Sequence, residues 1–266
     1  MRIVDLSSTV DASAEWEANP VEHRILSPAE GAAHMARQMR ENWSVDFDVS
    51  VLPDGELLSL DTFTLTSHTG THVDAPSHYG TRAAYGVPRH IDALPLEWFT
   101  GPGVVLDLTA APVGAAGADR LRAEFDRIGA VPGPGDIVLL HTGADRLAGS
   151  AKYFTDFTGL DGPATELLLD LGVRVIGTDA FSLDAPFADM IDRYHRTGDR
   201  SVLWPAHFTG RRREYCQIER LANLGTLPRP TGFTVCCFPV KLRGAGAGWA
   251  RAVALLEETE DPKEKP

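Results

Sequence analysis

Three histidines and one aspartate lie within eleven residues of this 266-residue chain, at His68, His72, Asp74 and His78. Imidazole and carboxylate groups are the ligands that suit zinc or manganese, and a catalytic metal site uses about three of them with one position left open. We interpret the cluster as a divalent-metal site. The alternative is a set of four unrelated polar side chains.

The spacing of the cluster supports this interpretation. If the segment is extended, His68, His72 and Asp74 lie at even spacings and point to one face of a strand. Gly70, between the two histidines, has no side chain that could block an ion. Pro76 should end the strand and turn the last histidine of the cluster back towards the same place.

The segment from 68 to 78 resembles the signature His-x-Gly-Thr-His-x-Asp-x-Pro-x-His of the metal-dependent cyclase family, which includes bacterial kynurenine formamidase and isatin hydrolase. The resemblance continues at His207 and Glu219, which stand twelve residues apart as the family's later metal ligands do. It spans the chain from Asp5 to about Leu256. It implies an α/β fold of the swivelling β/β/α type, with a curved, barrel-like mixed sheet and outer helices.

The resemblance also implies roles for individual residues. The family's ligands hold zinc or manganese, and the matching positions in this chain are His68, His72, Asp74, His207 and Glu219. The first three would hold one ion, and the last two would complete a second or shared site. The position of His78 is that of the family's proton shuttle. The resemblance further implies a homodimer or higher homo-oligomer that acts on a small molecule.

Within the family, the chain looks most similar to the branch found with aromatic polyketide synthases of actinomycetes. The segments that carry this likeness are residues 53–63 and residues 194–207. The chain departs from the hydrolases at His141, where arginine is usual, and at residues 15–17, which replace a Trp-Pro-Gly segment. We therefore expect aldol-type closure of a polyketide ring. The alternative is hydrolysis of an amide, formamide or lactam.

Both reactions can use one metal site. A bound divalent ion can lower the pKa of water, or it can polarise a carbonyl and stabilise an enolate. Histidine suits proton transfer in either reaction because its unperturbed pKa is close to the working pH. The distinction should therefore lie in the pocket. The aromatic residues that we expect to line it are Trp16, Phe63, Tyr79, Tyr85, Phe181 and Trp204.

Asp179 and Ser182 follow a predicted strand at residues 173–177, at the end where α/β proteins often place functional groups. A structural turn explains the same residues equally well, because aspartate and serine are good turn formers. His141 ends another predicted strand. It either lines the pocket or is a buried histidine with its hydrogen bonds satisfied.

Composition limits the remaining possibilities. A chain of 266 residues with 43% hydrophobic content can bury a full core, and we expect one domain over residues 1–256. The charged tail, residues 257–266, has nothing to bury and should fray. A formal net charge of -12 argues against binding to nucleic acid or anionic membranes. The short basic run at 211–213 is followed by Glu214 and is typical of a solvated loop or local ion pairs.

The three cysteines cannot all pair, and Cys236 and Cys237 are adjacent in an apolar run. We expect reduced core thiols rather than a disulfide framework. The first residues contain Asp5 where a signal peptide would be apolar, and no run of about twenty apolar residues is present. We therefore expect a soluble, cytoplasmic protein.

The secondary structure expected from the sequence alternates strand and helix in the middle of the chain, as in an α/β domain. A capping serine, a proline and a glutamate at 27–30 predict a helix to about residue 42. Between the first strand, at residues 2–6, and this helix we expect a polar loop. Strands are expected at 59–67, 104–108, 136–141, 173–177, 233–242 and 250–255, and helices at 117–128 and 160–171.

Overall fold

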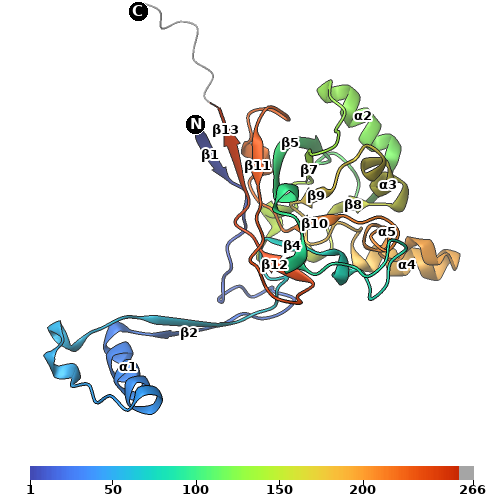
Figure 1. Ribbon diagram of the computed structural model, residues 1–266. Helices are drawn as coiled ribbons and strands as arrows, with labels where there is room; N and C mark the ends of the chain where they lie inside the picture. Colours follow the sequence, from blue (N-terminus) through green and yellow to red (C-terminus); the bar gives the residue numbers. More distant parts are fainter. Residues whose placement is uncertain (258–266) are drawn as a thin grey trace, which may run out of the picture. The chain divides into compact units, whose positions relative to one another are not determined.

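The computed structural model describes residues 1–257 (Figure 1). These residues form two compact units, one made of residues 1–10 and 67–257 and the other of residues 11–66. The predicted tail, 257–266, lies outside the described residues except for Glu257. The assignment of the whole chain to one domain stays a prediction.

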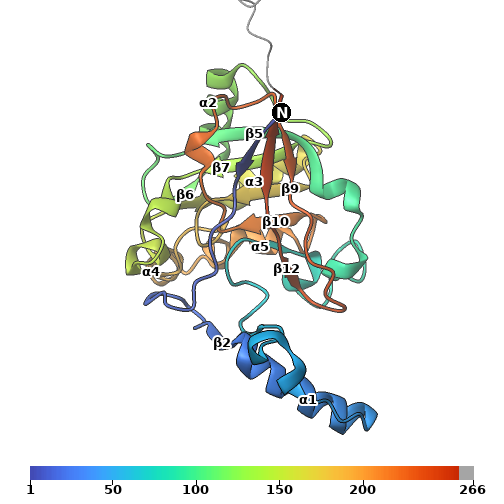
Figure 2. The same cartoon turned by 90° about the vertical axis from the view of Figure 1, so that its left-hand side faces the viewer.

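Within the described residues, the larger unit contains one mixed sheet of nine strands. In spatial order the strands are β1 (Arg2–Asp5), β13 (Val253–Leu256), β11 (Thr234–Cys236), β5 (Thr100–Asp107), β7 (Ile137–His141), β9 (Val175–Thr178), β10 (Cys216–Glu219), β4 (His72–Asp74) and β12 (Ala247–Trp249). The central strands β5, β7, β9 and β10 are parallel, and antiparallel strands continue the sheet on both sides. The sheet curls strongly, as Figures 1 and 2 show.

Helices lie together on one side of this sheet (Figure 1). They are α2 (Ala118–Ile128), α3 (Gly162–Asp170), α4 (Phe187–Thr197) and α5 (Pro205–Thr209), with a short parallel pair, β6 (Gly114–Ala116) and β8 (Thr158–Leu160), beside them. Leu121 of α2 and Leu168 of α3 pack against β-strand residues such as Leu106 and Leu140. Neighbouring residues of the same strands, among them Val105, face a second apolar cluster on the other side of the sheet.

The prediction of an α/β fold with a curved mixed sheet is confirmed. Helix α2 and strand β7 begin one residue later than expected, and β5 begins four residues earlier. The strand expected at 233–242 is formed only from Thr234 to Cys236. Beyond it, Pro239, which has no backbone N–H to donate, makes only an isolated bridge with Ala250. The sequence did not predict α4, α5, β6, β8, β10 or β12.

The unit of residues 11–66 consists of helix α1 (Pro28–Trp43), short 3₁₀ turns and a hairpin of β2 (Glu22–Leu26) with β3 (Leu60–Thr64). The capping box predicted for α1 is present: Ser27 and Glu30 bond each other's backbone N–H groups, and Pro28 is the first helical residue. The helix ends at Ser44, which takes a left-handed conformation.

Two expectations for this unit are wrong. Strand β2 lies where a polar loop was expected, and β3, expected to be half-buried, has all five residues exposed. A strand is buried only when another layer covers it. Within these 56 residues α1 buries just Gly31 and Ala32, so the unit supplies no such layer.

No helix among residues 1–257 combines the length and the hydrophobicity that are needed to cross a bilayer. All three cysteines are free thiols. Cys216 and Cys237 are buried, which agrees with their expected place in the core.

Candidate metal centre

Strand β4 carries the middle of the cluster and lies between β10 and β12 in the sheet. His72 and Asp74 point to the same face because they are two residues apart. The register places His72 directly opposite Glu219 of β10. The His72 Nε2 atom therefore lies 3.7 Å from the Glu219 Oε2 atom, although 147 residues of chain separate the two. Sheet pairing alone brings an early and a late residue together.

His68 reaches the cluster through a turn, which corrects the expectation of one extended strand. Residues 67–71 are turn and bend, and Gly70 has φ +66°, a left-handed conformation that favours glycine. A Cβ atom at Gly70 would lie 2.8 Å from the Val10 Cγ2 atom. The turn places the His68 Nδ1 atom 3.0 Å from Asp74 Oδ1 and 3.2 Å from His72 Nε2.

His207 comes from α5, a helix of five residues. Pro205 is its first residue, and Trp204 before it has φ 45°, a conformation rare for a bulky side chain. The His207 Nε2 atom lies 3.8 Å from Asp74 Oδ2 and 3.8 Å from Glu219 Oε1. The Nδ1 atom on the other side of the ring contacts the Asp184 carboxylate.

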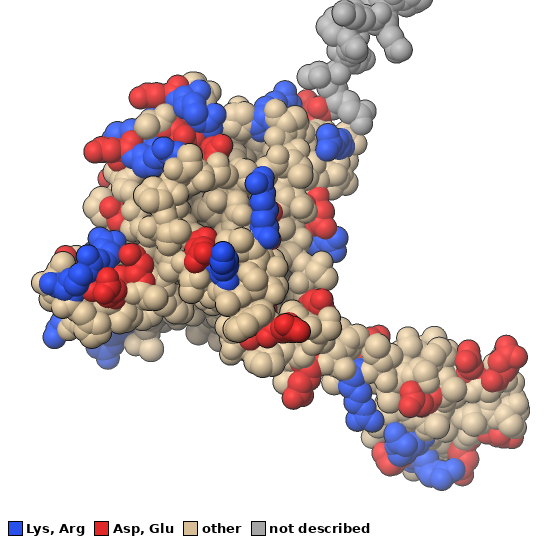
Figure 3. All heavy atoms as spheres, turned by 180° about the vertical axis from the view of Figure 1, so that it is seen from behind, with Lys and Arg blue, Asp and Glu red and all other residues tan. Residues whose placement is uncertain are grey.

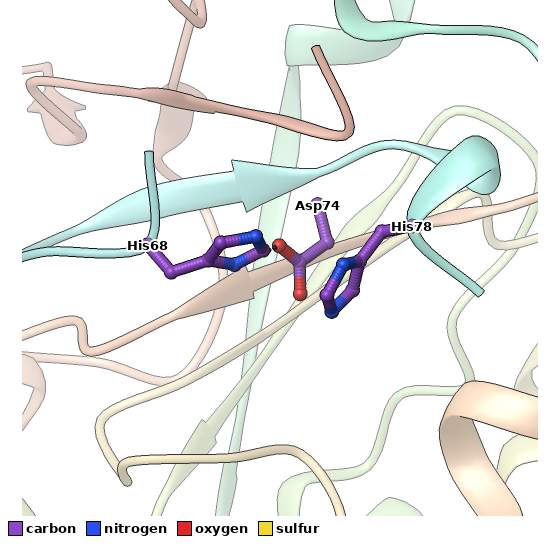
Figure 4. A group of neighbouring side chains, drawn as sticks. All are labelled: His68, Asp74 and His78. Carbon is purple, nitrogen blue, oxygen red and sulfur yellow. Dashed lines mark ion pairs between the residues drawn. The ribbon is translucent and has the colours of Figure 1, made fainter. Parts of the chain in front are cut away.

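His78 is at the end of a 3₁₀ turn, Pro76–His78, that begins at Pro76 as the sequence predicted. The rings of His68 and His78 lie on either side of the Asp74 carboxylate (Figure 4). The His78 ring centroid is 4.3 Å from that of His68 and 5.6 Å from that of His207. His78 is exposed whereas Asp74 is buried, so its ring can meet a molecule that arrives from solvent.

Ionisation in the cluster reflects burial and mutual charge. Burial by itself raises the pKa of Asp74, but His72 and His68 hold it well below its ordinary value. Burial and the Asp74 charge raise the pKa of Glu219. Burial acts to lower the pKa of His207, yet the Asp184 carboxylate raises it to about 9. Partial burial of the ring and the neighbouring imidazoles outweigh the Asp74 charge and lower the pKa of His78 to about 4, so this ring is neutral at pH 7.

The donor atoms of the cluster fit a divalent cation. The His72 Nδ1 atom donates to the Gly70 carbonyl oxygen, 2.8 Å away, so a neutral His72 ring presents a free lone pair at Nε2. That lone pair points at carboxylate oxygens, and both oxygens of Asp74 are buried without a hydrogen-bond partner. Acceptors that face acceptors repel each other unless positive charge lies between them. Two sets of ligand atoms lie within 4.8 Å of one another, His68, Asp74 and His78, and His72, Asp74 and Glu219.

The comparisons with known proteins agree with this geometry. A family model described as "Putative cyclase" matches residues 4–185. The chain belongs to the cyclase family. A kynurenine formamidase from Salinibacter ruber (strain DSM 13855 / M31) is 26% identical over 239 residues, which cover 90% of this chain and 97% of that protein.

Two solved structures show that this cyclase-family chain shares their fold. An isatin hydrolase bound to the product analogue thioisatinate superposes with a TM-score of 0.72 at 23% identity, over 96% of this chain and 92% of that one. A structure titled "Potential Metal-Dependent Hydrolase With Cyclase Activity" gives a TM-score of 0.62 at 18% identity, over 97% and 99% of the two chains. The chain is an enzyme, because its relatives over nearly its full length are enzymes.

The structure places the predicted pocket residues of this cyclase-family enzyme in four settings. Trp16 and Phe63 belong to the unit of residues 11–66, where Phe63 stacks on His23 at 4.1 Å. Tyr79 is 2% exposed, and its ring meets His207 edge-on at 5.6 Å. Tyr79 therefore contacts a candidate metal ligand. Direct contact of Trp16, Phe63 and Tyr79 with substrate stays a prediction. Tyr85 donates its hydroxyl hydrogen to the Gly210 carbonyl oxygen.

Phe181 and Trp204 belong to one aromatic row. Phe187 connects them, with ring centroids 5.8 Å from Phe181 and 5.5 Å from Trp204. The Arg220 guanidinium lies 5.9 Å from the Phe181 ring and near the His68 carbonyl, which links the row to the metal cluster. Phe187 is 44% exposed, so the middle of the row is open to solvent.

Sequence reasoning missed two interactions that hold the late ligands. The Asp184 carboxylate holds His207, and the backbone N–H of Leu183 donates to Glu219 Oε1 at 2.9 Å. Leu183 and Asp184 both lie in the loop after β9. The sequence had already pointed to this loop, because Asp179 and Ser182 follow the predicted strand. Ser182 accepts the Asp184 backbone N–H at 3.3 Å. A search for any carboxylate along this loop would have included Asp184.

Asp179 holds a turn. Its Oδ1 atom accepts the backbone N–H and the hydroxyl of Thr142, and its Oδ2 atom accepts the Gly143 N–H at 2.9 Å. These bonds fix the segment that follows β7 and His141. The structural reading of Asp179 therefore accounts for all of its side-chain contacts among the described residues.

Asp179→Asn should destabilise the fold and leave the metal cluster intact. The amide keeps one acceptor oxygen but turns an NH₂ group towards a backbone N–H, which should cost about 1–3 kcal/mol. Urea unfolding of the variant measures this, with the exposed Asp156→Asn as control. A stability equal to that of the wild type, together with lost activity, would assign Asp179 to the reaction instead.

Proposed function

We propose that this chain is a metal-dependent hydrolase that cleaves the C–N bond of an amide, formamide or lactam. The observation that carries the proposal is the meeting of ring nitrogens from His68, His72 and His207 around the buried Asp74 carboxylate, with the neutral His78 ring beside them. The similarity to a kynurenine formamidase over 97% of that protein supports a hydrolytic reaction. The structural similarity to an isatin hydrolase shows that the chain has a fold on which such hydrolysis takes place.

The residues that would hold the metal are His68, His72, Asp74, His207 and Glu219. They offer imidazole nitrogens and carboxylate oxygens, the donors that zinc and manganese accept. A divalent ion held there supplies Lewis acidity, which polarises a carbonyl oxygen and acidifies water. The buried Asp74 would be central because its two oxygens face different histidines: Oδ1 faces His68, and Oδ2 faces His207.

His78 would move the proton. A neutral imidazole accepts a proton at its free nitrogen, and at pH 7 the His78 ring is neutral. In hydrolysis, water loses a proton to His78 as its oxygen bonds to the carbonyl carbon. The C–N bond then breaks, and His78 returns the proton to the leaving nitrogen. The exposed position of this ring suits a group that must reach both water and substrate.

Ring closure of a polyketide is the second candidate function. The sequence favours it through His141, which replaces the arginine usual in the hydrolases, and through residues 15–17. Here His78 would take a proton from a carbon between two carbonyls. The resulting carbanion would bond to another carbonyl carbon, and the oxygen of that carbonyl would take the proton back from His78. The new hydroxyl would then leave as water with a hydrogen from the adjacent carbon. The aromatic row from Phe181 to Trp204 offers a surface for a planar substrate of several rings.

The expected partner is a small molecule. On the face shown in Figure 3, Lys and Arg side chains lie among Asp and Glu side chains. In the basic run at 211–213, Arg212 pairs with Glu166 at 2.8 Å and Arg213 pairs with Asp170 at 2.7 Å, the local ion pairs that the sequence suggested. The homodimer and the cytoplasmic location stay predictions.

Two assays separate the candidate reactions. Purified protein is supplied with formylkynurenine and with isatin, and separately the protein is coexpressed with an aromatic polyketide synthase. Turnover of an amide or lactam substrate, lost in Asp74→Ala and His78→Ala, is the expected result. A new fused-ring product without amide turnover would replace hydrolysis by ring closure.

The purified protein should contain a stoichiometric divalent metal, zinc or manganese. Asp74→Ala should lose both metal and activity because the substitution removes the carboxylate at the centre of the cluster. Elemental analysis of the wild type, of this variant and of the exposed control Asp156→Ala measures the effect. Full metal content in Asp74→Ala would show that the ligand set is wrong, and full activity in strong chelator would remove the metal from the reaction.

His78→Ala should keep metal and fold but lose about 10²-fold or more in rate, the range typical of a positioned acid or base. The matched control is His90→Ala, an exposed histidine outside the cluster. Rate, metal content and thermal unfolding are measured on both proteins. Loss of metal together with the rate would make His78 a ligand rather than a proton carrier.

A further inference from the structure

Asp184 contacts both the backbone and the side chain of a candidate metal ligand. Its side chain is fully buried, and no role was predicted for it from the sequence. The Oδ1 atom accepts the Ala206 backbone N–H at 2.6 Å, and Oδ2 accepts the His207 backbone N–H at 3.3 Å. The same Oδ2 atom contacts His207 Nδ1. One carboxylate therefore fixes the start of α5 and the ring that α5 carries.

The contact decides which nitrogen of His207 has a lone pair. A carboxylate can only accept, so the ring nitrogen that faces Asp184 carries a hydrogen. In the neutral ring the other nitrogen, Nε2, then keeps its lone pair, and it is Nε2 that faces Asp74 and Glu219 at 3.8 Å. The reverse tautomer would place an N–H where a metal ion must bind.

The backbone beside Asp184 is itself held firmly. The Leu183 carbonyl accepts the Leu160 N–H at 2.8 Å, and the Leu183 N–H donates to Glu219. Gly159 lets β8 pass so closely that a Cβ atom there would lie 2.2 Å from the carbonyl carbon of Asp184. The loop thus holds both late candidate ligands, Glu219 through a backbone N–H and His207 through a carboxylate.

We propose that Asp184 is the positioning residue of the metal centre, and that its carboxylate selects the His207 tautomer and orientation in which Nε2 can bind the ion. The inference rests on the proposed function, because it assumes that His207 is a ligand. It adds a residue that acts through His207 and does not itself touch metal or substrate. Outer carboxylates of this kind change metal affinity by about 10–100-fold when they are substituted.

The test is metal affinity, measured by titration of metal-free protein with zinc and, for its visible spectrum, with cobalt(II). Asp184→Asn should bind each metal about 10–100-fold more weakly and shift the cobalt absorption bands. The matched control is Asp161→Asn, because Asp161 also accepts a backbone N–H at the start of a helix, from Ala164 at 2.7 Å, but contacts no candidate ligand. That control should bind as the wild type does.

A double-mutant cycle shows whether Asp184 acts through His207. In the His207→Ala background, Asp184→Asn should have little further effect on affinity. An undiminished effect there, or wild-type affinity in the single variant, would overturn the proposal. A wild-type protein that binds no metal would instead overturn the proposed function.

One measurement does not depend on whether a variant folds. Nitrogen-15 NMR of the unmodified zinc-loaded protein should show His207 with its hydrogen on Nδ1 and none on Nε2. A hydrogen on Nε2 would overturn the proposal.

Discussion

The site depends on one buried carboxylate. Asp74 is fully buried, and neither of its oxygens accepts a hydrogen bond, although imidazole nitrogens surround it. Such a carboxylate is costly unless positive charge lies beside it. His72 and His207 answer this need in the protein alone, and their pKa values are raised above the ordinary value despite burial. A divalent cation would meet the same need, which is why the geometry points to metal chemistry.

Three separate elements bring the titratable side chains of the cluster to the buried Asp74 carboxylate. The β4–β10 register fixes His72 against Glu219. The Gly70 turn returns His68, and the loop that contains Asp184 aligns His207. The Gly70 turn directly precedes β4, but β10 and the loop that contains Asp184 come much later in the chain. The curl of the sheet and the short α5 helix therefore both help to hold these charged side chains close to Asp74.

The proposed site fits both candidate reactions, so residues outside it must separate them. His78 can take a proton from water or from carbon, since a neutral imidazole can act as a base towards either. We propose that the chain's own contribution to substrate choice lies in side chains such as Phe181, Phe187 and Trp204, which form an aromatic row connected to the cluster through Arg220. Similarity of fold to the hydrolases does not establish the function of these side chains, because one fold supports several activities.

The sequence by itself determined the α/β fold and the capping box of α1, because both follow from local spacing. A motif of eleven residues also pointed to His68, His72, Asp74 and His78, whereas His207 and Glu219 entered only through the family resemblance. The sequence failed where tertiary contacts decide. The turn at Gly70, the exposed face of β3 and the role of Asp184 depend on which layers and loops meet in space. An isolated aspartate in a loop has no local signal that distinguishes a turn former from a partner of a distant histidine. Only the folded chain, by burying Asp184 against His207, makes that distinction.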